Sequence, residues 1–117
     1  MMIIAVQGTN SFDDYQVFLR AKGVALSSMK EDDPYFYIYS AGPAKINSMV
    51  SEFSNLSERG MKSRGKKLKH YKVPPIWLSE NMDSIGYFAY LSKPKEPLSK
   101  LVTEAQQKNV DVGIYRY

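Results

Sequence analysis

The sequence predicts one α/β domain, a three-layer, Rossmann-like fold with a mostly parallel sheet of about five strands. Short apolar or aromatic runs alternate along the chain with longer segments of helical periodicity. A length of 117 residues, 44% of them hydrophobic, suits a single core over residues 1–117 and leaves no room for two. No repeat or low-complexity segment interrupts this alternation.

The first part of the chain predicts two strands, each followed by a helix. Residues 3–6 form a continuous apolar run, which is typical of a strand covered on both faces. Apolar residues at helical spacing then predict a helix at about 12–22. The aromatic run 35–39 predicts the second strand, and the i, i+3, i+4, i+7 pattern after it predicts a helix at about 43–58.

The second part of the chain continues the pattern after a basic loop that Gly60 and Gly65 flank. Because proline is well tolerated in a first helical turn, we expect Pro97 to start the last helix. The remaining predicted elements are an edge strand at 67–73, an irregular or helical linker at 77–83, a strand at 86–91, a helix at about 97–108 and a strand at 110–114.

Composition excludes several kinds of site. Cysteine is absent, so disulfides and cysteine-based zinc sites are excluded, and a single histidine excludes a multi-histidine metal centre. We therefore expect neither a metal nor a cofactor. Because His70 stands among lysines, we expect it to be a solvated surface residue and not a catalytic one. The acids nearest the predicted site, which we expect to be caps or surface residues, are Asp13, Asp14, Glu80 and Asp83.

The sequence also predicts a location in the cell. No segment approaches the roughly 20 apolar residues that a membrane span requires. The start of the chain has neither the basic leader nor the cleavage pattern of a signal peptide. We therefore expect a soluble, cytoplasmic protein with no membrane partner.

A ligand site is predicted where the strands end, because open parallel sheets bind ligands beyond their carboxyl ends, at the point where strand order reverses. The loops at 8–11, 40–45 and 92–95 would converge there. They supply hydroxyls, backbone N–H groups at helix starts and lysines, which together suit a phosphate. Ordinary capping is the alternative interpretation of each loop. The predicted ligand-binding residues are Gly8, Thr9, Asn10, Ser11, Ser40, Gly42, Pro43, Ala44, Lys45, Ser92, Lys93 and Lys95.

A second candidate site is the basic segment 59–72, which contains seven of the lysines and arginines and no acid in a chain of net charge +4. Such a cluster attracts a phosphate backbone, and Tyr71 and Trp77 nearby are suited to stacking a base. The alternative is a solvated loop beside an edge strand that lysines protect from aggregation. The residues predicted to contact nucleic acid are Arg59, Lys62, Arg64, Lys66, Lys67 and Lys69.

Several stretches of sequence resemble a known family. Residues 3–15, Ile-Ile-Ala-Val-Gln-Gly-Thr-Asn-Ser-Phe-Asp-Asp-Tyr, resemble the opening of the SLOG superfamily in its small YspA-like branch. Residues 39–44 resemble its second strand and glycine turn, and residues 87–95 resemble the strand and loop that precede its final helix. The resemblance implies a Rossmann-like fold that binds nucleotides or nucleotide-derived ligands.

Departures from the family pattern bear on catalysis. Some relatives, the LOG-type enzymes, cleave N-glycosidic bonds of nucleotides, whereas the DprA-type relatives bind single-stranded DNA. This chain lacks the LOG-type Pro-Gly-Gly-x-Gly-Thr element, and Asn10 replaces the usual arginine. It also has no G-x-G-x-x-G or Walker-type motif, which disfavours a dinucleotide dehydrogenase or a Walker-type NTPase.

The leading prediction is therefore a domain that binds a nucleotide or another phosphate-bearing small molecule, without catalysis. If the chain is an enzyme, the resemblance implies N-glycosidic hydrolysis of a nucleotide; no catalytic residue is assigned. One alternative is a virus-encoded interaction or assembly protein that keeps the fold without a ligand site and acts as a homo-oligomer or with a protein partner. The other is nucleic-acid binding through the segment 59–72.

Overall fold

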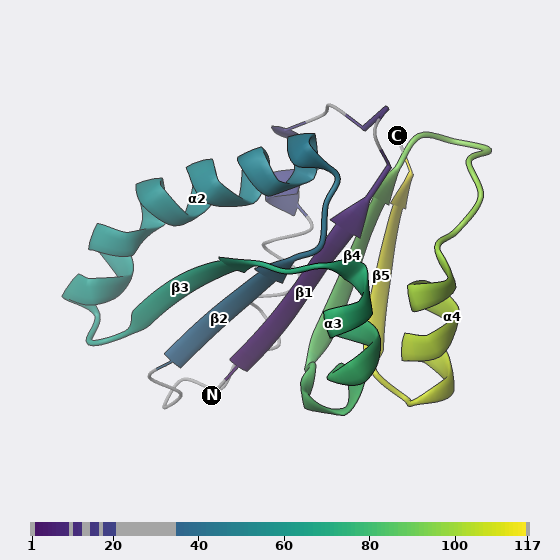
Figure 1. The fold of residues 1–117 in the computed structure, drawn as a ribbon. Helices are drawn as coiled ribbons and strands as arrows, with labels where there is room; N and C mark the ends of the chain where they lie inside the picture. The colour runs from purple at the N-terminus through teal and green to yellow at the C-terminus, as the bar shows by residue number, and fades with distance from the viewer. Residues whose placement is uncertain (1, 10, 13–14, 17, 21–34, 117) are drawn as a thin grey trace.

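The computed structural model describes residues 2–9, 11–12, 15–16, 18–20 and 35–116, in which five strands form one all-parallel sheet (Figure 1). The strand order is β3-β2-β1-β4-β5, with helices between successive strands. The predicted α/β fold class is confirmed. The strands are β1 (Met2–Gly8), β2 (Tyr35–Ser40), β3 (Lys67–Lys72), β4 (Tyr87–Ser92) and β5 (Asp111–Arg116). The helices are α2 (Ala44–Ser63), α3 (Pro75–Glu80), the short 3-10 helix η1 (Met82–Ser84) and α4 (Lys100–Gln107).

The two strands in the middle of the sheet are buried on both faces. All six residues of β4 are buried, and so are residues 4–7 of β1. This burial explains why both strands have continuous apolar runs, since helices cover each face of a parallel sheet.

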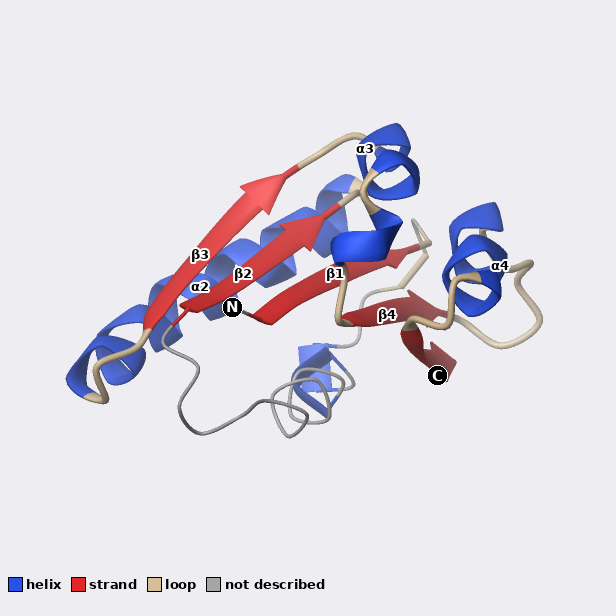
Figure 2. Ribbon diagram, turned by 90° about the horizontal axis from the view of Figure 1, so that it is seen from below, coloured by secondary structure: helices blue, strands red, loops and turns tan. Residues whose placement is uncertain are grey.

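The sheet separates two apolar cores. On one face, Ile46, Val50 and Phe53 of α2 pack with Phe12 and Phe18 against the sheet. On the other face, Leu78 of α3 and Leu101 and Val102 of α4 pack against Ala5 and Phe88. In Figure 2, α3 and α4 lie in front of the sheet and α2 lies behind it, which gives the three layers.

Strand order reverses between β1 and β4. The chain adds β2 and then β3 on one side of β1, and α3 and η1 then carry it back so that β4 pairs on the other side. In the register, Val6 of β1 is opposite Ser40 of β2, and Gly8 is opposite Leu91 of β4. The loops that follow these three strands therefore leave the same edge of the sheet, as predicted, and this edge at β1 and β4 is the switch point.

Two helices differ from their predicted bounds. The helix predicted at about 43–58 continues to Ser63, so the loop predicted from Gly60 is wrong up to that residue. Nothing lies within 4 Å of the place of a side chain at Gly60, and one glycine costs a long amphipathic helix only about 1 kcal/mol. The last helix begins at Lys100 and not at Pro97, because Ser99 is the N-cap and its hydroxyl accepts a hydrogen bond from Leu101 N at 3.2 Å.

The remaining predictions of secondary structure stand close to the structure. The predicted edge strand is β3, at one edge of the sheet, and the linker 77–83 is mostly helical. Residues 15, 16 and 18–20 of the predicted first helix are helical, and the rest of that prediction lies outside the described residues, except that residue 12 is not helical. Within the described part of the chain, no helix has both the length and the apolarity needed to cross a bilayer.

Candidate functional site

Backbone hydrogen bonds hold the three loops together at the switch point. Ala41 N donates to Val6 O at 3.0 Å, Gly8 N donates to Gly42 O at 3.4 Å, and Thr9 N donates to Leu91 O at 3.0 Å. A Cβ at residue 8 would overlap Leu91 O and lie 2.8 Å from Ile46 Cδ1, so only glycine lets β1 end so close to β4. The predicted convergence of the loops at 8–11, 40–45 and 92–95 therefore has a physical basis in this packing.

A carboxylate lies among the polar groups of two of these loops. Glu96 follows the turn after β4, and its carboxylate accepts hydrogen bonds from Thr9 Oγ1 at 2.9 Å, Ser11 Oγ at 2.6 Å and Lys93 N at 2.7 Å. Hydrogen bonds to an ionised carboxylate favour its charged form. The Ser11 hydroxyl, and after it the Lys93 N–H, therefore lower the pKa of Glu96. The switch point thus holds an anion supplied by the chain itself.

The loop after β2 presents fewer free donors than expected. Gly42 N donates to Asn47 Oδ1 at 2.9 Å, and Pro43 has no N–H. Ala44 and Lys45 lie exposed in the first turn of α2, where no side chain caps the helix. This loop can therefore offer a ligand the first amides of α2 and the Lys45 ammonium group, but not the Gly42 amide.

Ser40 points away from the predicted site. It is completely buried on the α2 side of the sheet, and its Oγ lies 2.7 Å from His70 Nε2. The other ring nitrogen of His70, Nδ1, lies 3.3 Å from Ser51 Oγ of α2. Burial, and after it the Lys72 ammonium group, lowers the pKa of His70. The prediction that His70 is a solvated surface residue is therefore only partly right: its ring is half-buried and joins a partly buried polar chain that ties β2 and β3 to α2.

Ser92 is the last residue of β4 and not part of the loop. It is completely buried, and among the described residues its Oγ has no hydrogen-bond partner. Gln7 of β1 is 9% exposed, and its Oε1 likewise lacks a partner there. Gln7 is opposite Tyr90 in the register, and Ser92 lies two residues after Tyr90 in β4. Because Tyr90 belongs to the core that α3 and α4 cover, the side chains of Gln7 and Ser92 both lie on that face, close to the switch point. Buried polar atoms without partners are rare, and these two require an explanation.

The other predicted residues of this edge are exposed or undescribed. The side chains of Lys93 and Lys95 are exposed in the turn 93–95. Asn10 lies outside the described residues, and so do Asp13 and Asp14. Around the switch point, the structure thus brings together Gly8, Thr9, Ser11, Gly42 and Lys93.

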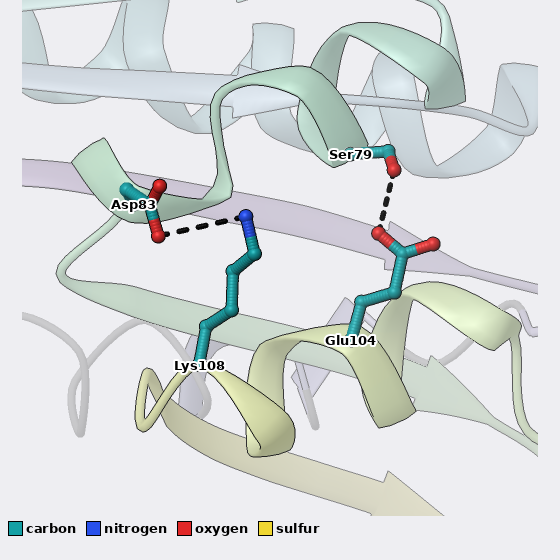
Figure 3. Close-up of polar contacts among 4 residues, drawn as sticks. All are labelled: Ser79, Asp83, Glu104 and Lys108. Atoms are coloured by element: carbon teal, nitrogen blue, oxygen red, sulfur yellow. Dashed lines mark hydrogen bonds and ion pairs between the residues drawn. The ribbon is translucent and has the colours of Figure 1, made fainter.

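Two of the four acids predicted to be caps or surface residues, Glu80 and Asp83, lie away from this edge. Glu80 is exposed at the end of α3, and Asp83 Oδ1 lies 3.5 Å from Lys108 Nζ. Ser79 Oγ also donates to Glu104 Oε2 at 2.6 Å. Figure 3 shows that both contacts join the α3–η1 segment to α4. The Ser79–Glu104 and Asp83–Lys108 contacts thus connect these segments at the surface.

The basic segment is partly helical and is gathered around a cavity. Arg59 and Lys62 belong to the last turns of α2 and not to a loop, whereas Arg64 and Lys66 belong to the turn before β3. A cavity of about 530 Å³ opens between this turn and the start of β2 and β3. Its lining residues are Tyr35, Glu58, Lys62, Gly65, Lys66, Lys67, Leu68 and Lys69, so it brings together four of the six predicted nucleic-acid contacts.

Comparison with known proteins does not identify the chain. No protein-family model matches it, and no curated protein matches its sequence. The resemblance to the SLOG superfamily therefore stays a prediction.

Sequence reasoning missed Glu96, although it makes three hydrogen bonds at the switch point. Glu96 lies 87 residues from Thr9 and 85 from Ser11, and no motif connects them. Ser40 could have been placed correctly, because Phe36, Ile38 and Ser40 alternate along β2 and must share a face.

Proposed function

We propose that the switch point binds a nucleotide or another phosphate-bearing small molecule, without catalysing a reaction. The observation that carries the proposal is the convergence of Thr9 Oγ1, Ser11 Oγ and Lys93 N on one carboxylate. A phosphate also presents ionised acceptor oxygens, and such oxygens form the same short, charge-assisted hydrogen bonds as a carboxylate. In this proposal Glu96 is an internal stand-in, which a phosphate displaces when it binds.

Three further features support a ligand at this place. The switch point of an open parallel sheet is where ligands of such folds bind. Ser92 Oγ and Gln7 Oε1 are buried beside it without partners in the described structure, so a ligand that displaces the Glu96 loop would gain two polar atoms to bind. Lys45, Lys93 and Lys95 are exposed around it and would offset the charge of a phosphate. A nucleotide-binding SLOG-like domain is the family assignment that agrees with this proposal.

The proposal is restricted to binding because the titratable groups are poorly suited to catalysis. A general base works best when its pKa lies near the operating pH. The hydrogen bonds from Ser11 and Lys93 move the pKa of Glu96 in the opposite direction. His70 is occupied by Ser40 on the α2 side of the sheet.

The test is isothermal titration calorimetry with nucleoside mono-, di- and triphosphates, and with pyrophosphate as the minimal probe. Glu96→Ala removes the internal anion and frees its donors, so we expect affinity to rise at least about tenfold. Thr9→Val with Ser11→Ala removes two donors, so we expect affinity to fall at least about tenfold. Glu104→Ala is the matched control, because it removes a carboxylate that also accepts a serine hydroxyl, but on α4.

Two results would contradict the proposal. One is the absence of binding by the wild type and by Glu96→Ala at millimolar nucleotide and pyrophosphate. The other is an equal rise of affinity in Glu96→Ala and Glu104→Ala, because net charge alone would then explain the change.

A further inference from the structure

One half of the sheet carries aromatic rings on the face opposite α2. The side chains of residues 35, 37 and 39 alternate with the buried ones of β2 and share this face. Parallel pairing places Lys67, Lys69 and Tyr71 of β3 directly beside them. The ring of Trp77 in α3 stacks on the ring of Tyr39, near the carboxyl end of β2. We call the five rings, Tyr35, Tyr37, Tyr39, Tyr71 and Trp77, the aromatic face.

The rings of the aromatic face form one continuous series. Their centroids are 6.3 Å apart for Tyr35–Tyr37, 6.1 Å for Tyr37–Tyr71, 5.2 Å for Tyr39–Tyr71 and 4.3 Å for Tyr39–Trp77. Three of these four pairs are stacked. The series therefore extends over the length of β2, from its first residue to the start of α3.

This series is only partly covered. Tyr35 is 45% exposed and Tyr71 is 41% exposed, and the other three rings are half-buried. Figure 2 shows why: of the described helices on this side, α3 lies at the carboxyl ends of β2 and β3, and α4 lies at the other half of the sheet, beside β4. Aromatic rings bury large areas when they are covered, so a row of them left at the surface marks an interaction site.

Positive charge lies directly beside the rings. Lys67 is opposite Tyr35 and Lys69 is opposite Tyr37 on the same face. Both lysines also line the 530 Å³ cavity at the start of the strands, where four of the eight lining residues are lysines and one is a glutamate. This cavity also reaches Glu58 and Lys62 of α2, on the other side of the sheet. A partner that lies on the aromatic face therefore meets rings along β2 and, beside them, the ammonium groups of β3.

We propose that the aromatic face binds single-stranded nucleic acid, with bases stacked on the exposed rings and the phosphate backbone along Lys67, Lys69 and the cavity. Aromatic side chains on a flat sheet, combined with a basic groove, are the chemistry that binds unpaired bases. Alternate side chains of one strand lie about 6.6 Å apart. That spacing exceeds the rise of about 3.4 Å in a duplex strand, so it suits splayed bases and not a stacked duplex.

The charges argue against the main competing occupant, a second copy of this chain. A two-fold interface brings the same patch of both subunits into one buried surface, so it would gather Lys67 and Lys69 of both copies there, and none of the described residues of the aromatic face is an acid that could pair with them. Like charges brought together across an interface cost several kcal/mol. A polyanion with flat rings satisfies both components of the surface. This site shares no residue with the proposed nucleotide site.

The test measures binding of a fluorescently labelled thymidine oligomer of about 15 nucleotides by fluorescence anisotropy, at salt concentrations from about 20 to 300 mM. Trp77 is the only tryptophan, so its emission reports whether the strand lies at the aromatic face. We expect binding that weakens with salt and is accompanied by quenching of Trp77. A duplex of the same length should compete poorly.

Matched variants separate stacking from charge. Tyr71→Ala should lower affinity about tenfold at every salt concentration, whereas Tyr71→Phe, which keeps the ring, should bind as the wild type does. Lys67→Gln with Lys69→Gln should reduce the slope of log affinity against log salt by about 1.4, or about 0.7 for each phosphate contact. Lys100→Gln with Lys108→Gln removes the same charge from exposed positions on and beside α4 and should leave the slope unchanged.

Four results would overturn the proposal. The first is no binding at the lowest salt. The second is an equal loss of slope in the two double-lysine variants. The third is loss of oligomer binding in Thr9→Val with Ser11→Ala, because the strand would then lie at the switch point. The fourth is a stable dimer by light scattering that does not bind the oligomer.

Discussion

Alanine at residue 8 should destabilise the fold strongly, although it adds a single methyl group. A Cβ there would overlap the Leu91 carbonyl oxygen, which is backbone and cannot turn away, and would lie 2.8 Å from Ile46 Cδ1. The end of β1 must therefore move from β4, which breaks the hydrogen bond from Thr9 N to Leu91 O. Loss of that bond costs about 1 kcal/mol, and forced repacking adds about 1–3 kcal/mol. The free energy of unfolding should fall by about 3 kcal/mol.

Urea denaturation measures this change, and Gly60→Ala is its matched control. Nothing lies within 4 Å of the position of a Cβ at Gly60, which is inside α2, so the same substitution should raise the free energy of unfolding by about 0.5–1 kcal/mol. At roughly 4 °C for each kcal/mol in a domain of this size, the two melting temperatures should differ by about 15 °C. If Gly8→Ala unfolds at the same urea concentration as the wild type, β1 and β4 do not approach as described.

Two further predictions concern the polar contacts. Because the pKa of His70 lies below its unfolded value of about 6.5, the contribution of His70 to the free energy of unfolding should be constant above that pH, decrease as the pH falls below it, and level off below the folded pKa. His70→Gln should remove this slope in denaturation curves between about pH 7.5 and 5, and an unchanged slope would show that another group titrates. Ser99→Ala removes the N-cap of α4 and should lower the free energy of unfolding, measured by urea denaturation, by about 1 kcal/mol, whereas Ser99→Asp should change it little. Equal losses of stability in both variants would contradict the capping role.

Much of the fold could be predicted because local pattern and tertiary environment agree. The apolar runs of β1 and β4 correspond to strands buried on both faces, and the i, i+3, i+4, i+7 spacing in α2 corresponds to a helix buried on one face. These elements lie where they were expected. The errors concern helix ends. Proline and glycine suggest boundaries at Pro97 and Gly60, but a serine hydroxyl caps one helix, and α2 continues past Gly60 to Met61, which packs against the core.

The candidate sites could be predicted only as far as topology determines them. The rule for parallel sheets brings the loops after β1, β2 and β4 to one edge, and this required no side-chain detail. The partner of Thr9 and Ser11 could not be foreseen, because Glu96 is distant in sequence and its loop has no motif. The aromatic run 35–39 predicts a strand by its propensity. Its division into a buried row and a row of tyrosines follows from the period of two along a strand and requires no structure.

The pairing of β1 has a consequence for how the chain folds. β1 forms hydrogen bonds with β2 on one side and with β4, which begins at Tyr87, on the other. While the chain is being synthesised, one edge of this apolar strand therefore stays unpaired until β4, about 80 residues later in the sequence, has been made. Pairing between strands so far apart in sequence is slow. Until it occurs, the nascent chain presents an adhesive edge on which other unfinished chains can assemble.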